Sequence, residues 1–235
     1  MSSVAKDEQH GDARLTTDAG ERQLAAWEIA SIVSSMLIAE WIAASVADGS
    51  RLFVAIPIAL AFAFMIVSHR LRNEGWSDLG FRFDNFVHSG LLLLPPMVLV
   101  AVVCFALGRW FGGQTNFQRW HAGTPIVGQL ALGFGWGLAQ QYVLQAFINR
   151  RAQSVLGKGW LSVLLVAAVF SALHLPNAWL VVVTFTGGVI WAAVYQRTPN
   201  LFALAVSHSV MTWVVVSTLP PSALHHLRIG FKYFG

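Results

Sequence analysis

The sequence predicts an all-α membrane protein: a polytopic transmembrane helix bundle with about seven spans, in a range of six to eight. Hydrophobic residues make up 56% of the chain and charged residues only 11%, whereas soluble domains carry about 25% charged residues. The apolar residues also form long blocks. A helix rises about 1.5 Å per residue, so roughly 20 apolar residues cross a hydrocarbon core of about 30 Å.

Seven apolar blocks are candidate spans, and together they define a transmembrane helical domain over residues 24–219. They run over Leu24–Ala47, Leu52–Ser68, Phe86–Leu107, Val127–Ile148, Trp160–Leu175, Ala178–Tyr195 and Leu201–Leu219. The second, fifth and sixth blocks are short or depend on neighbouring residues, which gives the range of six to eight.

Two polar segments flank this domain. Residues 1–23 are polar and mixed in charge, and they predict a disordered N-terminal tail. Because no apolar stretch lies near Met1, we expect no signal peptide, so the first span stays as an anchor. Residues 220–235 predict a weakly basic C-terminal tail without a clear fold.

The distribution of Lys and Arg predicts that the N-terminus lies inside. With seven alternating spans, ten cations then fall inside: Lys6, Arg14, Arg22, Arg70, Arg72, Arg82, Arg150, Arg151, Lys158 and Arg197. Five fall outside: Arg51, Arg109, Arg119, Arg228 and Lys232. We expect an integral protein of a bacterial-type inner or plasma membrane. The net charge of +4 indicates contact with anionic lipid headgroups, and no nucleic-acid-binding motif is visible.

Polar residues inside the apolar blocks are candidates for function, because polar groups are costly in hydrocarbon. In the fourth span, Gly133 and Gly137 have the four-residue spacing that lets two helices approach closely. Gln141, Gln145 and Asn149 follow at four-residue steps and form one polar row. Such amides also serve as interhelical hydrogen-bonding groups, which is the structural alternative.

Three further polar positions lie in other spans. His174 ends an apolar block just before Pro176, where a histidine is often interfacial or bonded to a backbone carbonyl. His208 lies several residues inside the last span, and Thr212 follows one turn later on the same face. Glu40 is the one carboxylate deep in a span, with a structural, hydrogen-bonded role as its alternative.

The order of these positions resembles the CPBP family of intramembrane endopeptidases, which includes CAAX-type prenyl-protein proteases and bacteriocin-processing proteins. That family carries Glu-Glu-x3-Arg, then Phe-x3-His, then His-x3-Asn. The second motif is present as Phe170 and His174, and the third is partly kept as His208, with Thr212 where Asn is expected. The resemblance covers roughly residues 76–215.

The first motif departs from the family pattern. Gln140 and Gln141 stand where the two glutamates belong, and Gln145 stands where the arginine belongs. The three changes remove both signs of charge together, so no unpaired charge is stranded in low dielectric. The resemblance implies that a Glu takes a proton from water while histidines position the water or a metal. Glutamine cannot act as a general base and can only hydrogen-bond the water.

No other carboxylate lies near the motifs, because every Asp and Glu precedes Asn85. Glu40 or Glu28 would have to reach the site from the first helix, and Glu40 is the alternative base. We expect no cofactor. A catalytic zinc commonly has three protein ligands; His174 and His208 could supply two of them, and Gln140 is a poor third.

Three functions therefore remain open. The first is a protein of this family's fold that holds a membrane-embedded peptide or a lipidated protein tail with little or no hydrolysis, a pseudoenzyme. The second is an active endopeptidase that uses a substitute base such as Glu40. The third is a small-molecule carrier. In each case we expect Gln140, Gln141, Gln145, His174 and His208 to line one internal cavity.

Overall fold

The computed structural model describes residues 3–46, 51–120 and 123–234, and every regular element in these ranges is helical. The α-helices are α1 (Ser3–Leu37), α2 (Ala44–Val46), α3 (Arg51–Leu71), α4 (Phe86–Trp110), α5 (Ile126–Gln141), α6 (Arg150–Leu156), α7 (Trp160–Ala172), α8 (Ala178–Arg197), α9 (Leu201–Thr218) and α10 (Pro221–Leu224). Two π-helices, η1 (Ile38–Ala43) and η2 (Tyr142–Asn149), and two 3₁₀ helices, η3 (His225–Leu227) and η4 (Gly230–Tyr233), complete the order.

Each of the seven predicted spans coincides with a helix, which confirms the helical membrane bundle. Within the described ranges, five helices are long and apolar enough to cross a membrane: Ala19–Val46, Leu52–Leu71, Phe86–Trp110, Ala178–Arg197 and Leu201–Thr218. The fourth predicted span is α5 and its direct continuation η2. The fifth is α7, an apolar helix of only 13 residues, which rises about 20 Å.

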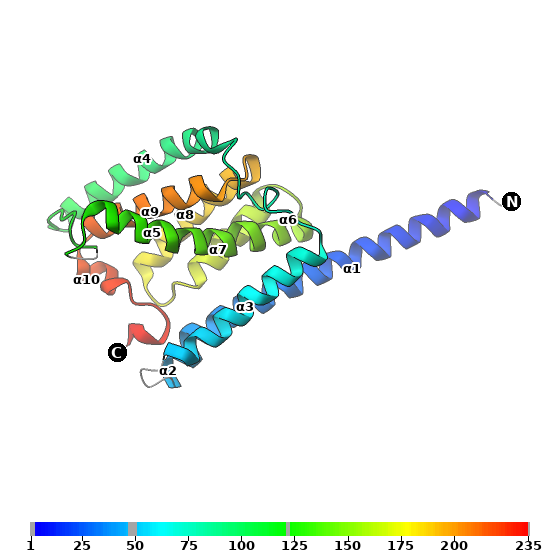
Figure 1. The fold of residues 1–235 in the computed structure, drawn as a ribbon, viewed down its shortest axis with the longest axis horizontal. Coiled ribbons are helices and arrows are strands. Elements are labelled where there is room, and N and C mark those ends of the chain that lie inside the picture. The colour runs from blue at the N-terminus through cyan, green and yellow to red at the C-terminus, as the bar shows by residue number, and fades with distance from the viewer. Residues whose placement is uncertain (1–2, 47–50, 121–122, 235) are drawn as a thin grey trace.

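The two ends of the chain differ from the sequence-based expectation. The structure continues α1 back to Ser3, through residues for which we predicted disorder (Figure 1). That stretch has no proline, and only Gly11 and Gly20 weaken its helix propensity strongly. The C-terminal tail, for which we predicted no clear fold, forms α10, η3 and η4 and packs against the bundle.

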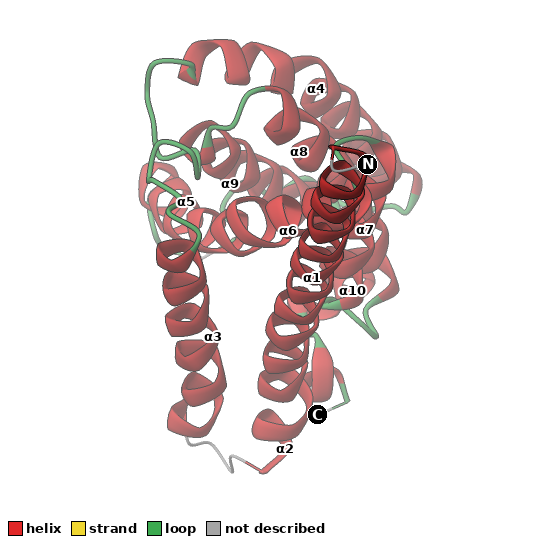
Figure 2. Cartoon of the chain, turned by 90° about the vertical axis from the view of Figure 1, so that its right-hand side faces the viewer, coloured by secondary structure: helices red, strands yellow, loops and turns green. Residues whose placement is uncertain are grey.

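The helices form two groups that lie against each other. Helices α1 and α3 run as a neighbouring pair, beside a bundle made by α4–α9 (Figures 1 and 2). In that bundle α9 packs against both α4 and α5, while α7 packs against α8. Helix α6 contacts α1 and joins the two groups.

The loops gather at two opposite ends of the bundle, as an alternating seven-span path requires. At one end, Asn85 Nδ2 donates to the Pro199 carbonyl at 3.1 Å, and the Gly159 amide donates to Gln196 Oε1 at 3.0 Å. At the other end, the Asn116 amide donates to the Ser217 carbonyl at 2.9 Å. The loops that we predicted to share one side of the membrane therefore meet.

A buried ion cluster lies at the first of these ends. The Arg151 guanidinium is 1% exposed and pairs with Glu28 of α1 at 2.8 Å and with Glu74 of the α3–α4 loop at 2.8 Å. Arg72 also forms an ion pair with Glu28 at 2.9 Å. The Ser68 hydroxyl donates a hydrogen bond to the same carboxylate. The cluster therefore connects α1, α3, the loop before α4, and α6.

Glu74 is the most heavily hydrogen-bonded carboxylate of this cluster. Burial alone would raise the pKa of its carboxyl, but hydrogen bonds from His69, Arg151 and Arg150 outweigh burial and hold that pKa well below its usual range. Glu74 therefore stays ionised and keeps the positive charge of Arg151 compensated.

We predict a large loss of stability for Arg151→Leu. The change leaves the carboxylates of Glu28 and Glu74 with one cation fewer beside them. Breaking a buried ion pair costs about 3–5 kcal/mol. The matched control is Arg70→Leu on the exposed face of α3, with an expected change within about 0.5 kcal/mol. Thermal unfolding of the two purified variants in detergent measures the difference, and equal midpoints would contradict a stabilising role for the cluster.

Candidate functional site

Helix α5 packs closely against α9. A Cβ placed on Gly137 would lie 3.2 Å from the Ala205 carbonyl oxygen and 3.2 Å from His208 Cβ, and one on Gly133 would lie 2.6 Å from Ser209 Oγ. The close approach predicted from the glycine spacing is therefore present. It sets Gln140 and Gln141, one turn further along α5, beside His208.

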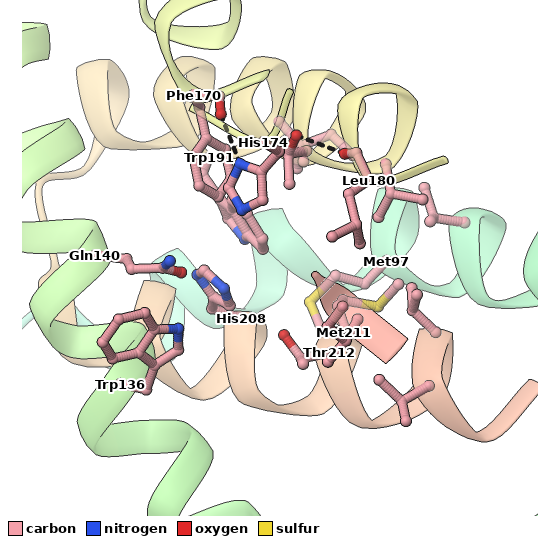
Figure 3. A pocket seen from close by; sticks show the side chains of 18 of the residues that line it. Met97, Trp136, Gln140, Phe170, His174, Leu180, Trp191, His208, Met211 and Thr212 are labelled. Carbon is pink, nitrogen blue, oxygen red and sulfur yellow. Dashed lines mark hydrogen bonds between the residues drawn. The ribbon is translucent and has the colours of Figure 1, made fainter. Parts of the chain in front are cut away.

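The larger of two cavities beside these residues lies between α4, α5, α8 and α9 and has a volume of about 210 Å³. Four of the predicted site residues line it: Gln140, His174, His208 and Thr212. Figure 3 shows these side chains facing a shared space, with Met97, Met211 and Trp191 among the apolar residues around them. The cavity thus has a polar centre and mainly apolar walls.

His174 has a defined orientation. It lies in the turn that follows α7, and its Nδ1 is 2.8 Å from the Phe170 carbonyl oxygen. A carbonyl can only accept, so Nδ1 carries a proton and the neutral ring presents Nε2 as an acceptor. The Phe170 ring packs edge-on against the imidazole at 4.9 Å. The Phe-x3-His motif therefore fixes both the position and the tautomer of this histidine.

His208 is held from two sides. The Trp191 ring stacks on its imidazole with centroids 4.6 Å apart and 9° between the planes. Gln141 Nε2 lies 3.1 Å from His208 Nδ1, and with this amide orientation the glutamine donates, which leaves Nε2 to carry the ring proton. Two histidines with complementary exposed nitrogens, an acceptor on His174 and a donor on His208, therefore face the same cavity.

Gln141 and Gln145 do not line either cavity, contrary to our expectation. Gln141 is fully buried against His208, and Gln145 Oε1 accepts from Asn149 Nδ2 at 2.8 Å. Successive residues of a helix point about 100° apart, so when Gln140 faces the cavity, Gln141 faces α9. The predicted polar row exists, but it is a buried interhelical network that continues through Asn149 to Gln196.

A second cavity of about 160 Å³ places Glu40 near this centre. It is lined by Glu40 of η1 and shares Gln140, His174, Trp136 and other residues with the larger cavity. The tail supplies a cation to this region, since Lys232 interacts electrostatically with Glu40. Glu40 and the residues after Gln141 lie on π-helices, which are rare and are found frequently at functional sites.

Sequence reasoning missed the contribution of the tail to the site. Leu227 and Ile229 line the larger cavity, and Ile229 also lines the second one. The alternation of apolar and polar residues at 227–229 was the only sequence signal, and it is too short to indicate contact. Among the described residues, no group of three or more His, Cys, Asp or Glu side chains is placed to hold a metal ion.

These features define a helical membrane protein with a paired-histidine cavity inside its bundle. A family model described as Type II CAAX prenyl endopeptidase Rce1-like matches residues 17–214. The chain belongs to this family. The match reaches back to α1 and thus extends well beyond the 76–215 range of the sequence resemblance. No curated protein and no solved structure matches the chain.

The contact between α5 and α9 can be tested with paired glycine substitutions. Gly137→Val forces α5 away from Ala205 and His208, and such overpacking costs about 1–3 kcal/mol. Gly135→Val on the same helix meets no atom within 4 Å and should change stability little. Thermal unfolding in detergent compares the two, and equal losses would show that the close approach does not hold the site together.

Proposed function

We propose that this protein binds an apolar or lipidated peptide tail in the cavity centred on Gln140, His174 and His208, and that it hydrolyses the tail poorly or not at all. The observation that carries this proposal is the lining of the larger cavity, which contains two histidines and Gln140 but no carboxylate among the described residues. Membership of a CAAX prenyl endopeptidase family supports the class of ligand.

The chemistry of the polar centre supports binding over hydrolysis. An activated water needs a group that accepts its proton near the working pH, and a positioned base contributes about 10²–10⁴-fold. Gln140 has no such basic site. The donor and acceptor nitrogens of the two histidines can still hydrogen-bond a peptide carbonyl or amide, while the surrounding walls hold apolar groups.

We propose that the cavity opens toward lipid beside Trp136. This side chain lines both cavities and is 64% exposed. A volume of about 210 Å³ is below the about 300–1,000 Å³ of typical ligand pockets. The cavity therefore takes part of a chain that enters from the membrane, with the remainder lying along the exposed faces of the helices.

We also propose the orientation that the charge distribution favours. The loop end that holds the ion cluster also carries Arg82, Lys158 and Arg197. Loops rich in Lys and Arg face the cytoplasm. This end is therefore assigned to the inside, with the N-terminus on the same side.

The binding proposal predicts capture without cleavage. A farnesylated peptide with a photoreactive group should crosslink to the protein in proteoliposomes, while mass spectrometry detects no shortened peptide. His208→Ala should reduce capture, whereas Val98→Ala, at an exposed position of α4 outside both cavities, should not. Release of a shortened peptide that stops in His174→Ala would establish a hydrolase instead.

A gain-of-function variant sharpens this test. Gln140→Glu returns a carboxylate to the wall that both cavities share. If the missing base is what limits hydrolysis, this variant should produce a shortened peptide where the wild type does not. Capture should persist in both proteins.

Hydrolysis with Glu40 as the base is the second candidate, favoured by one observation. Glu40 lines a cavity together with Gln140 and His174, so the nearest carboxylate faces the motif residues from η1. An ionised Glu40 would accept the proton from a water between it and His174.

The two candidates predict different results for Glu40→Gln. If Glu40 is the base, the wild type hydrolyses the farnesylated peptide and the variant loses that activity by at least about 10²-fold, with an unchanged unfolding midpoint. If the chain only binds, neither protein hydrolyses the peptide and capture is unchanged. Glu21→Gln, on the exposed part of α1, is the matched control. Turnover that survives in Glu40→Gln would exclude Glu40 as the base.

A further inference from the structure

The segment after α9 folds back over the turn that carries His174. Arg228 and Ile229 have extended backbone conformations. Leu227 and Ile229 line the larger cavity, whereas Arg228 between them is exposed. Alternate side chains of an extended chain point in opposite directions. The segment therefore lies along the cavity with two extended residues at its centre, flanked by Leu227 and Gly230, which have positive φ angles of 62° and 55°.

Hydrogen bonds to its backbone, two from a side chain and one from the main chain, hold the segment in this position. Asn177 Nδ2 donates to the Leu224 carbonyl at 2.8 Å and to the Arg228 carbonyl at 3.1 Å. The Gly230 amide donates to the Leu175 carbonyl at 2.8 Å, directly after His174. Main-chain hydrogen bonds combined with alternate side-chain pockets are how proteins recognise extended peptides.

Gly230 fixes where the segment passes. Its φ of +55° lies in the left-handed region, and a Cβ there would lie 2.6 Å from the Glu40 carbonyl oxygen. A larger residue cannot fit between η1 and the His174 turn without displacing one of them. The path of the segment over both cavities thus depends on this glycine.

We propose that residues 227–230 occupy, within the same chain, the binding site for an extended apolar peptide beside His174. An incoming peptide displaces them, places apolar side chains at alternate positions in the two cavities, and donates a backbone amide to the Leu175 carbonyl. The nature of the incoming ligand rests on the proposed function. The claim that residues 227–230 occupy the site rests only on the contacts that these residues make.

Cysteine accessibility tests this occupancy in the full-length protein. Cys104 is the only cysteine, so a Cys104→Ala background with Val216→Cys places one thiol on the cavity wall. Val216 is a buried member of the apolar cluster against which Leu227 and Ile229 pack. Gly230→Ala should displace the segment and raise the rate of maleimide labelling about tenfold, because labelling follows the open population.

Gly112→Ala is the matched control, because Gly112 also has a positive φ of +67° but meets no atom within 4 Å. Gly112→Ala places a side chain on a left-handed backbone, as Gly230→Ala does, but it causes no steric clash. The rate of maleimide labelling should therefore stay unchanged. Equal labelling rates in Gly230→Ala and Gly112→Ala would overturn the proposal.

A shortened chain that ends at His226 provides the second measurement. Its Val216→Cys thiol should label fast, and an added peptide with the sequence of residues 224–234 should slow the labelling, whereas a scrambled peptide should not. Fast labelling that the matching peptide leaves unchanged would overturn the proposal, as would slow labelling of the shortened chain.

The same proteins separate this inference from the proposed function. If the labelling results are as expected but neither the full-length nor the shortened chain captures the farnesylated peptide, only the proposed function fails. If both chains capture that peptide equally while labelling never changes, only occupancy by the tail fails. Stronger capture by the shortened chain supports both.

Discussion

The guanidinium of Arg151 is a full charge that is almost completely excluded from solvent, and the positions of several helices follow from its need for counterions. Removing an ion from water costs several kcal/mol, which is recovered only with close, well-oriented partners. Glu74 accepts hydrogen bonds from both guanidinium NH2 groups, and a carboxylate oxygen of Glu28 lies 2.8 Å from Arg151 Nε. Because α6 continues the helix formed by α5 and η2, this pairing also fixes the rotation and depth of the helix that carries Gln140 and Gln141.

Along that continuous helix, neutral amides precede the charged cluster. Gln141, Gln145 and Asn149 are buried and uncharged, and the charged pair Arg150 and Arg151 follows at the end of the row. Hydrogen bonds link three of the amides here, from Asn149 to Gln145 and from Gln196 to Asn149. The chain therefore has charge at one end of the bundle, where Arg150 and Arg151 meet carboxylates, and no charge at Gln140, Gln141 and Gln145 on the same helix.

The spans were predictable from the sequence because a bilayer leaves few alternatives: apolar blocks of sufficient length must become helices.

For the site, the sequence also predicted that Gln140, His174 and His208 line one cavity, and the structure brings these three residues together there. The direction of the Gln141 side chain was not predicted correctly, since our expectation placed Gln140, Gln141 and Gln145 together in the cavity although neighbouring positions on a helix point in different directions. Glu28 and Arg151 lie near the ends of apolar blocks, where sequence alone suggests interfacial charges, so their pairing was missed. The tail was missed because contacts across long sequence separations leave no local pattern.

The 13-residue length of α7 has a consequence for the surrounding membrane. A helix that rises about 20 Å is shorter than a hydrocarbon layer of about 30 Å, and a bilayer responds to such hydrophobic mismatch by thinning locally. The turn with Leu175 and Asn177 therefore lies where the acyl chains would otherwise continue. A thinner layer there brings headgroups and water closer to His174 than its position in the chain suggests. The thickness of the bilayer then affects the site. Water would reach the histidine pair to different extents in bilayers of short-chain and of long-chain phospholipids.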